Sequence, residues 1–302
     1  MAGKIRRLGI LIALTAVLML GVVLFAFSYS DVGKIDELMN EVLTVSADDF
    51  SAVPQSVAED AGRLAAEQYG DSHEKYKDFV DQLLATYIKA EDKDFIVVFN
   101  SGGWGWNLLD KTPGWSSILA GIRSELDDLG YESIILSYRR TSDTIRGRLK
   151  ECAEVTTDYP SKAKDLACRV EFLTAHIPDL RVIVTGESNG TVISDYSMNI
   201  LRDNPQVYSI QTGVPFWHKS VMLDRTLVLN SNGTGPDTFS QGDITTMLWL
   251  TLRDWLGLPN QEENPGRIGY YVRAPGHDYS WQYPEVYSQV VEFLETNFEV
   301  RQ

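Results

Sequence analysis

Cysteine, histidine and positive charge are all scarce in this sequence. Two cysteines and four histidines are spread over 302 residues, without HExxH or paired CxxC spacing, so no metal site and no cofactor are expected. Lys and Arg together number 27 against 42 Asp and Glu, which gives a formal net charge of -15. Nucleic-acid binding requires a basic face, so that class of partner is excluded. The hydrophobic content of 44% is enough for one large α/β core.

An uncharged apolar run occupies residues 8–27, LGILIALTAVLMLGVVLFAF. A helix needs about 20 such residues to cross a bilayer, so the run predicts a transmembrane signal-anchor within residues 1–30 that contacts the lipid. Basic residues precede the run and acidic residues follow it. The positive-inside rule then predicts a single-pass protein of the cell membrane, with the remainder of the chain outside the cytoplasm. The alternative is a signal peptide cleaved after residues 26–28 and a secreted protein.

Residues 31–92 are charged and rich in helix-forming residues. Apolar residues recur at steps of three and four over residues 76–88, which predicts an amphipathic helix, and another helix is expected over residues 56–69. We expect this segment to cover the edge of a sheet or to link the chain to the membrane.

From residue 93 onward, strand-like and helix-like segments alternate. This alternation predicts an α/β fold with a mostly parallel sheet of about six strands and helices on both faces. Ligands of such sheets bind beyond the carboxyl ends of the strands. The expected strands are residues 95–99, 132–138, 182–185, 207–212, 226–230 and 268–273, and the main helices are residues 115–129 and 284–298. Residues 244–258 are rich in tryptophan and leucine and are either a mobile lid or fixed core.

Ser188 stands in the sequence GESNG, between an apolar strand and a helical pattern. A strand, a sharp turn and a helix form the context of a nucleophile elbow, in which the serine hydroxyl projects from the end of the sheet. Gly186 and Gly190 leave room for the strand and the helix to pass each other. Ser188 is therefore the candidate nucleophile.

A second glycine-rich loop, NSGGWGW at residues 100–106, follows the strand at residues 95–99. Glycines at the end of a strand let backbone amides approach a ligand closely. The amide of Asn189 and one amide from Gly102 or Gly103 are the expected donors of an oxyanion hole.

A serine hydroxyl is a weak nucleophile at neutral pH and needs a base. His277 follows the last expected strand and precedes the closing helix, so it is the candidate base, whereas His218 is expected to line an entrance or to lie on the surface. A carboxylate must orient the base. Asp237, in a loop after the strand at residues 226–230, is favoured over Asp243, and both can reach.

These motifs together resemble the α/β-hydrolase-fold serine hydrolases of the esterase and lipase type, over roughly residues 93–298. The resemblance rests on NSGGWGW after the first core strand, GESNG after a central one, the GPD segment and GHD before the last helix. It implies that Ser188, Asp237 and His277 are nucleophile, acid and base, and that residues 93–302 are the catalytic domain. The loop carries Asn100-Ser101 where many members have His-Gly, and the two leading strands of larger members are missing.

Several tryptophans fall on segments expected near the catalytic edge and indicate the substrate class. Trp104, Trp106 and Trp217 are expected to line a pocket for an apolar acyl or aromatic group, and Trp249 and Trp281 to lie near it, with core packing an equal explanation for Trp249. A carboxylic ester, small or lipid-like, is the leading substrate. A peptidase or amidase would use the same triad, and a non-catalytic hydrolase-like domain for surface binding or assembly is the alternative of a different class.

Two further points stay open at this stage. Arg139 and Arg140 follow a strand at the same edge as the glycine loop, where they either bind an anionic group or are paired. A helical hairpin turning at Pro160 would place Cys152 opposite Cys168, as a disulfide or as two separate thiols.

Overall fold

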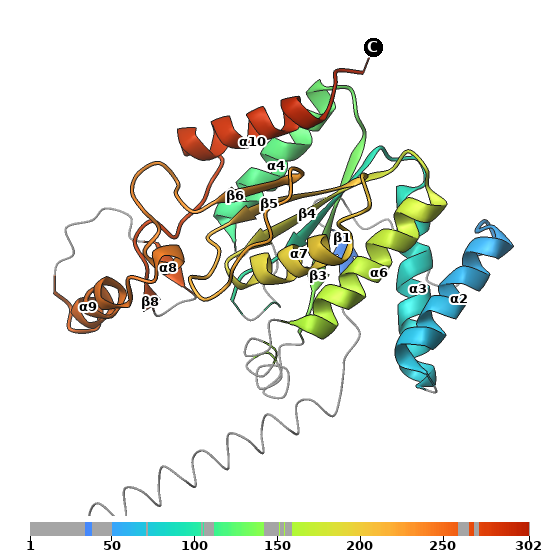
Figure 1. Cartoon of the computed structure of the whole chain (residues 1–302), viewed down its shortest axis with the longest axis horizontal. Coiled ribbons are helices and arrows are strands. Elements are labelled where there is room, and N and C mark those ends of the chain that lie inside the picture. Colours follow the sequence, from blue (N-terminus) through green and yellow to red (C-terminus); the bar gives the residue numbers. More distant parts are fainter. Residues whose placement is uncertain are drawn as a thin grey trace, which may run out of the picture.

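The fold is α/β, with a mostly parallel sheet flanked by helices (Figure 1). The computed structural model describes residues 34–37, 50–70, 72–103, 105, 112–141, 151, 154, 159–258, 266–268 and 272–301, and of residues 34–37 it describes the backbone alone.

Six strands form the main sheet in the order β1-β3-β2-β4-β5-β6. β1 pairs antiparallel with β3, and the other neighbouring pairs are parallel. The strands are β1 (Lys34–Glu37), β2 (Phe95–Asn100), β3 (Ser133–Arg139), β4 (Arg181–Glu187), β5 (Val207–Thr212) and β6 (Thr226–Leu229). The five strands predicted between residues 95 and 230 are thus confirmed.

Helices cover both faces of the sheet. Successive side chains of a strand point to opposite faces, so a buried strand contributes apolar side chains to both. In β2, Ile96 and Val98 pack into one apolar cluster, while Phe95, Val97 and Phe99 pack into another. The first cluster takes in α2 (Gln55–Tyr69), α3 (His73–Ala90), α6 (Pro160–His176) and α7 (Asn189–Ile200). The second takes in α4 (Pro113–Asp128) and α10 (Pro284–Asn297), which lie together on the opposite face in Figure 1.

The register brings three strand ends to one rim. Asn100 at the end of β2 lies opposite Gly186 of β4, and Glu187 at the end of β4 lies opposite Thr212 of β5. Loops that leave these ends therefore meet at the same edge, as the parallel sheet predicts.

The segment before the sheet is partly as expected. The helices predicted over residues 56–69 and 76–88 are confirmed as α2 and α3. However, β1 is a strand in a stretch expected to be helical, and it caps the sheet edge at β3. A sheet edge offers backbone donors and acceptors that a short segment satisfies whatever its helix propensity.

The strand predicted at residues 268–273 is wrong as a member of the main sheet. Instead, β7 (Arg267–Ile268) and β8 (Val272–Arg273) pair antiparallel with each other in a separate two-stranded sheet. This pair lies beside α9 (Ile244–Trp255), at the far left of Figure 1, and the short α8 (Thr238–Gln241) lies between α9 and the main sheet.

The expectation of a transmembrane helix ahead of the α/β fold is corrected. In the part of the chain that the structure describes, no helix combines the length and the apolar character needed to cross a bilayer. The run at residues 8–27 itself lies outside the described residues.

Candidate active site

Ser188 forms the sharp turn between β4 and α7. Its φ of 51° and ψ of -123° lie in a region that non-glycine residues rarely occupy. Two close contacts force this geometry. A Cβ on Gly190 would lie 2.1 Å from the carbonyl oxygen of Asn100, and a Cβ on Gly186 would lie 2.8 Å from the nitrogen of Thr191. Gly186 therefore lets β4 and α7 approach closely, Gly190 lets α7 approach the end of β2, and Ser188 takes the strained backbone conformation of a nucleophile elbow.

His277 and Asp237 are hydrogen-bonded to each other. The His277 Nδ1 to Asp237 Oδ2 distance is 2.8 Å, and both side chains are buried. Asp237 also caps α8, because its Oδ1 accepts from the backbone N–H groups of Phe239 and Ser240. With Nδ1 held in this way, Nε2 is the ring nitrogen left for a second partner.

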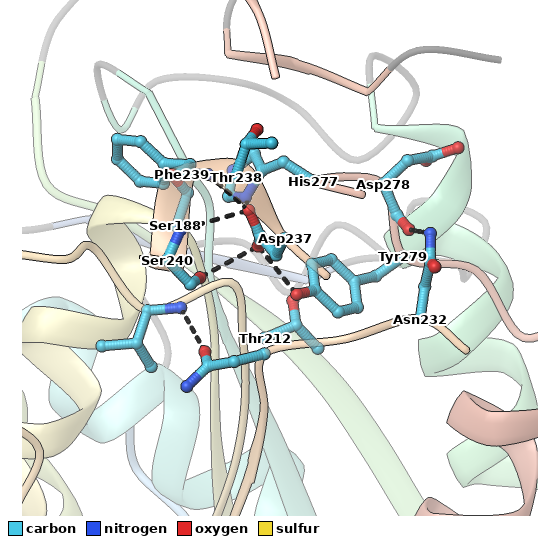
Figure 2. A network of polar contacts seen from close by, with 12 residues as sticks. Ser188, Thr212, Asn232, Asp237, Thr238, Phe239, Ser240, His277, Asp278 and Tyr279 are labelled. Atoms are coloured by element: carbon cyan, nitrogen blue, oxygen red, sulfur yellow. Dashed lines mark hydrogen bonds and ion pairs between the residues drawn. The ribbon is translucent and has the colours of Figure 1, made fainter. Parts of the chain in front are cut away.

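The Asp237 carboxylate collects further donors, as Figure 2 shows. The hydroxyls of Tyr279 and Ser240 donate to Oδ2 at 2.8 Å and 2.9 Å. Burial alone would raise the pKa of Asp237, but the hydrogen bond and charge of His277, with the Tyr279 and Ser240 donors, outweigh it and lower that pKa. The carboxylate is therefore held ionised beside the imidazole.

The dipeptide Thr212-Gly213 links the elbow to the histidine. The Ser188 N–H donates to the Thr212 carbonyl at 3.0 Å. A Cβ on Gly213 would lie 2.5 Å from His277 Cε1, so the imidazole packs directly on the Gly213 backbone, whose φ of 64° suits glycine. The elbow and the imidazole thus contact adjacent residues at the end of β5.

Asp243, the alternative carboxylate, lies elsewhere. Its side chain caps α9, where Oδ1 accepts from the Thr246 N–H at 3.1 Å, and hydrogen bonding by the Thr246 side chain and then by this N–H lowers the pKa of Asp243. The carboxylate that contacts His277 is Asp237, because the residues after Asp237 turn into α8 and keep its oxygens against the ring.

Two amides lie near the Ser188 side chain. Asn189 is the first residue of α7, a position at which the N–H has no acceptor within the helix. Gly102 packs against the elbow, and a Cβ there would lie 3.2 Å from Ser188 Cβ. Gly103 takes a φ of 56°, and its carbonyl accepts from Asn189 Nδ2 at 3.5 Å. The structure thus brings Asn189, Gly102 and Gly103 together around the elbow.

Glu187 is a neighbour that the sequence did not reveal. Its Oε2 accepts from the Gly102 N–H at 3.4 Å. Burial raises the pKa of this carboxyl above its usual value, against the opposing effects of His277 and the Gly102 N–H. The contact between Glu187 and the glycine loop could not be predicted from the sequence, because Gly102 lies 85 residues away along the chain.

Of the expected pocket residues, Trp217 lies near the histidine. Its ring packs edge-on against Phe239 at 5.2 Å, and Phe239 packs on His277 at 4.8 Å. Trp104 and Trp106 lie outside the described residues. Trp249 is exposed on α9, and Trp281 packs over Gly121 of α4, so neither lines the surroundings of His277.

His218 is not the surface imidazole that one of the two expectations made it. Its side chain is buried, and Nε2 lies 2.9 Å from Asp195 Oδ2 on α7. Asp195 also accepts from the Val221 N–H, so the pair fastens the loop after β5 to the elbow helix.

The remaining polar expectations concern cysteine and metals. Cys168 carries a free thiol, and Cys152 lies outside the described residues. Among the residues whose positions are described, no group of three or more His, Cys, Asp and Glu side chains could hold a metal ion.

Comparison with known proteins gives distant structural likenesses alone. No protein-family model and no curated protein matches the chain. Among solved structures, it resembles a Trichoderma reesei cutinase in complex with a C11Y4 phosphonate inhibitor. The identity is 11% and the TM-score 0.31, and the match covers 61% of this chain and 79% of that one. A likeness of this size assigns no residue, so the roles below rest on the geometry of the site.

Proposed function

We propose that this protein is a serine hydrolase that cleaves carboxylic esters with a hydrophobic acyl or aromatic group through an acyl-enzyme intermediate. The observation that carries the proposal is the His277 Nδ1 to Asp237 Oδ2 contact of 2.8 Å, made where Thr212-Gly213 also contacts the strained Ser188 elbow. A nucleophile, a base and a carboxylate that orients the base are the groups that acyl transfer needs.

In the first half-reaction, Ser188 Oγ attacks the ester carbonyl carbon while His277 Nε2 takes its proton. Asp237 keeps the other ring nitrogen protonated and stabilises the imidazolium. The negative charge that forms on the carbonyl oxygen is stabilised by the N–H of Asn189, at the N-terminus of α7, and by the N–H of Gly102, in the loop after β2, for which this oxygen replaces Glu187 Oε2 as acceptor. Collapse of this tetrahedral species expels the alcohol, which leaves with the proton from His277.

The second half-reaction repeats these steps with water. His277 Nε2 takes a proton from the water, whose oxygen attacks the acyl carbon. The same amides stabilise the oxyanion, and Ser188 leaves as the proton returns to its oxygen. The carboxylic acid is released and the hydroxyl is restored.

The preference for an apolar acyl or aromatic group is supported by the rings beside the base. Phe216, Trp217 and Phe239 form a set of edge-on contacts that reaches His277, with about half of the Phe216 and Trp217 surfaces exposed. Aromatic side chains with apolar faces in reach of a reacting group favour apolar substrate parts over charged ones.

Hydrolysis of p-nitrophenyl acetate, butyrate and laurate, with the matching p-nitroanilides, tests the proposal. We expect ester cleavage by the wild type and a loss of about 10⁶-fold in kcat for Ser188→Ala, as when a catalytic serine is removed elsewhere. Ser231→Ala is the matched control. The Ser231 hydroxyl lies in the loop before Asp237 and donates a hydrogen bond to the Gly235 carbonyl, so its loss removes a serine hydroxyl that has no role in the proposed reaction.

Each result has a distinct meaning. Cleavage of the anilides in preference to the esters would make the protein an amidase. Failure to cleave either class, with Ser188 unreactive, would leave a hydrolase-like binding domain and contradict the proposal.

A further inference from the structure

The buried pair of Arg140 and Glu151 lies directly behind the glycine loop. Arg140 follows β3, and its Nε donates to Glu151 Oε1 at 2.7 Å, with exposures of 0% and 1% for the two side chains. The second carboxylate oxygen accepts from the Thr141 hydroxyl at 2.6 Å. Removing two charges from water costs several kcal/mol per ion in effective terms, which only close pairing and further hydrogen bonds offset.

The rest of the guanidinium is directed at the backbone of the glycine loop. Its Nη1 donates to the Ser101 carbonyl, and its Nη2 donates to the Gly103 carbonyl at 2.8 Å. The loop then wraps around the side chain, because a Cβ on Gly105 would lie 2.4 Å from Arg140 Cγ. A planar fork with several fixed donors is what such a two-carbonyl grip requires, and an ammonium group cannot reproduce it.

These contacts fix the direction of an amide. In a trans peptide unit the C=O and the following N–H point to opposite sides. The unit that joins Ser101 to Gly102 has its carbonyl drawn toward Arg140, so the Gly102 N–H is turned away from Arg140. It faces the end of β4, where it donates to Glu187 beside Ser188.

We propose that Arg140, held in place by Glu151, is the positioning residue of the oxyanion hole. It does not touch the substrate. By holding the carbonyls of Ser101 and Gly103, it keeps the Gly102 N–H directed to the end of β4 beside Ser188, where the carbonyl oxygen of the substrate would replace Glu187 Oε2 as its acceptor. This inference rests on the proposed function, because the amide acts only if Ser188 attacks an acyl group. It also decides the question left open by the sequence: Arg140 is paired and does not serve as an anion site.

The test compares Arg140→Lys with Arg225→Lys. Arg225 is the matched control, because its guanidinium also donates to backbone carbonyls, those of Arg202, Asn204 and Val207, at the other end of the sheet. Steady-state kinetics with p-nitrophenyl butyrate and inhibition by a trifluoromethyl ketone, whose hydrated or serine-bound form mimics the tetrahedral oxyanion, are measured for both variants. Thermal unfolding reports the folded fraction.

We expect kcat of Arg140→Lys to fall about 10²-fold with little change in KM, the effect of losing one oxyanion donor. Inhibition by the ketone should weaken by about the same factor, because a transition-state analogue follows kcat/KM. Arg225→Lys should lose thermal stability without either change. Glu151→Gln supplies the same readouts if Arg140→Lys does not fold, since the guanidinium then loses its charged partner.

The proposal is overturned if folded Arg140→Lys, or Glu151→Gln in its place, keeps kcat and ketone inhibition within about threefold of wild type, far short of a lost donor. The pair would then be structural only. Failure of the proposed function looks different, because the wild type itself would neither cleave the ester nor bind the ketone, and the inference would fall with it.

Discussion

Asp237 accepts hydrogen bonds from two directions, and it is the carboxylate that contacts His277. Backbone amides of α8 and the Ser240 hydroxyl hold it from its own loop, while His277 and Tyr279 donate from the segment after β8. A carboxylate with this many donors keeps a lowered pKa, so it remains charged and holds the imidazole in one tautomer.

Replacing Asp237 tests this arrangement against its rival. We expect Asp237→Asn to lower kcat by about 10⁴-fold, because the amide favours the wrong histidine tautomer. Asp243→Asn should leave kcat unchanged, since Asp243 caps α9 and has no contact with His277. Ester hydrolysis by both purified variants is the measurement, and a larger loss in Asp243→Asn would assign the role to Asp243.

Because of Glu187, the free energy of unfolding is expected to depend on pH. Its pKa in the folded protein is raised above the usual 4.5, so the folded state binds more protons than the unfolded state between those two values. The free energy of unfolding therefore decreases as pH rises through that window, and the loss is complete above the folded pKa.

Glu187→Gln isolates this effect, because glutamine can still accept from Gly102 but cannot ionise. In urea unfolding at a series of pH values, the variant should gain stability over wild type as pH rises from about 4.5, the usual pKa of a glutamate side chain. A difference between the two proteins that stays constant over the series would show that Glu187 keeps an ordinary pKa.

At the scale of elements, the sequence predicted the strands of the main sheet well and their partners less well. Continuous apolar runs identify buried strands such as β2 and β4 because both faces are covered. The same logic misplaced residues 268–273, since periodicity does not tell which sheet a strand joins. β1 was not predicted, because its segment is rich in helix-forming residues and its strand conformation comes from pairing with β3.

The candidate site divides in the same way. Ser188 and His277 could be found because a strand-turn-helix pattern and chain order mark them. The choice of the carboxylate could be narrowed only to Asp237 or Asp243, because the loop after the strand at residues 226–230 is long enough for either to reach the histidine. The roles of Tyr279, Glu187 and Arg140 depend on contacts across the fold that no local pattern encodes.

Of the two close approaches at the elbow, the one at Gly190 is the tighter. In Gly190→Ala the new Cβ would meet the Asn100 carbonyl at 2.1 Å, so α7 or the end of β2 must shift. We expect a loss of about 1–3 kcal/mol in unfolding free energy, typical of overpacking, together with loss of ester hydrolysis.

Gly235→Ala is the matched control for this substitution. A Cβ added at Gly235 would have no other atom of the described residues within 4 Å, so this replacement should change the unfolding free energy by less than about 0.5 kcal/mol. Equal stability of the two variants in urea would contradict the tight packing of the elbow.

At the scale of the whole molecule, two apolar clusters on opposite faces of one sheet stabilise the rim that carries the site. Trp115 joins the cluster of α4 and α10 to this rim, because its buried ring packs on Phe99 and its Nε1 donates to the Thr212 hydroxyl at 3.0 Å. By contrast, the apolar side chains of α9 are largely exposed, with Trp255 at 69%.

Replacing Trp115 or Trp255 by alanine should change the free energy of unfolding by very different amounts. Trp115→Ala should destabilise the protein by about 3–5 kcal/mol, the usual cost of removing a large buried aromatic side chain. Trp255→Ala should stay within about 0.5 kcal/mol of wild type, because an exposed side chain loses little packing. Urea unfolding monitored by circular dichroism compares them, and a larger loss in Trp255→Ala would contradict this description of the core.

The reactivity of Ser188 is tested most directly by locating the adduct of a fluorophosphonate probe on the intact protein by peptide mass spectrometry. The account predicts one adduct, on Ser188, which is absent from Ser188→Ala and forms far more slowly in His277→Ala. An adduct on any other residue, or labelling that persists in Ser188→Ala, would contradict it.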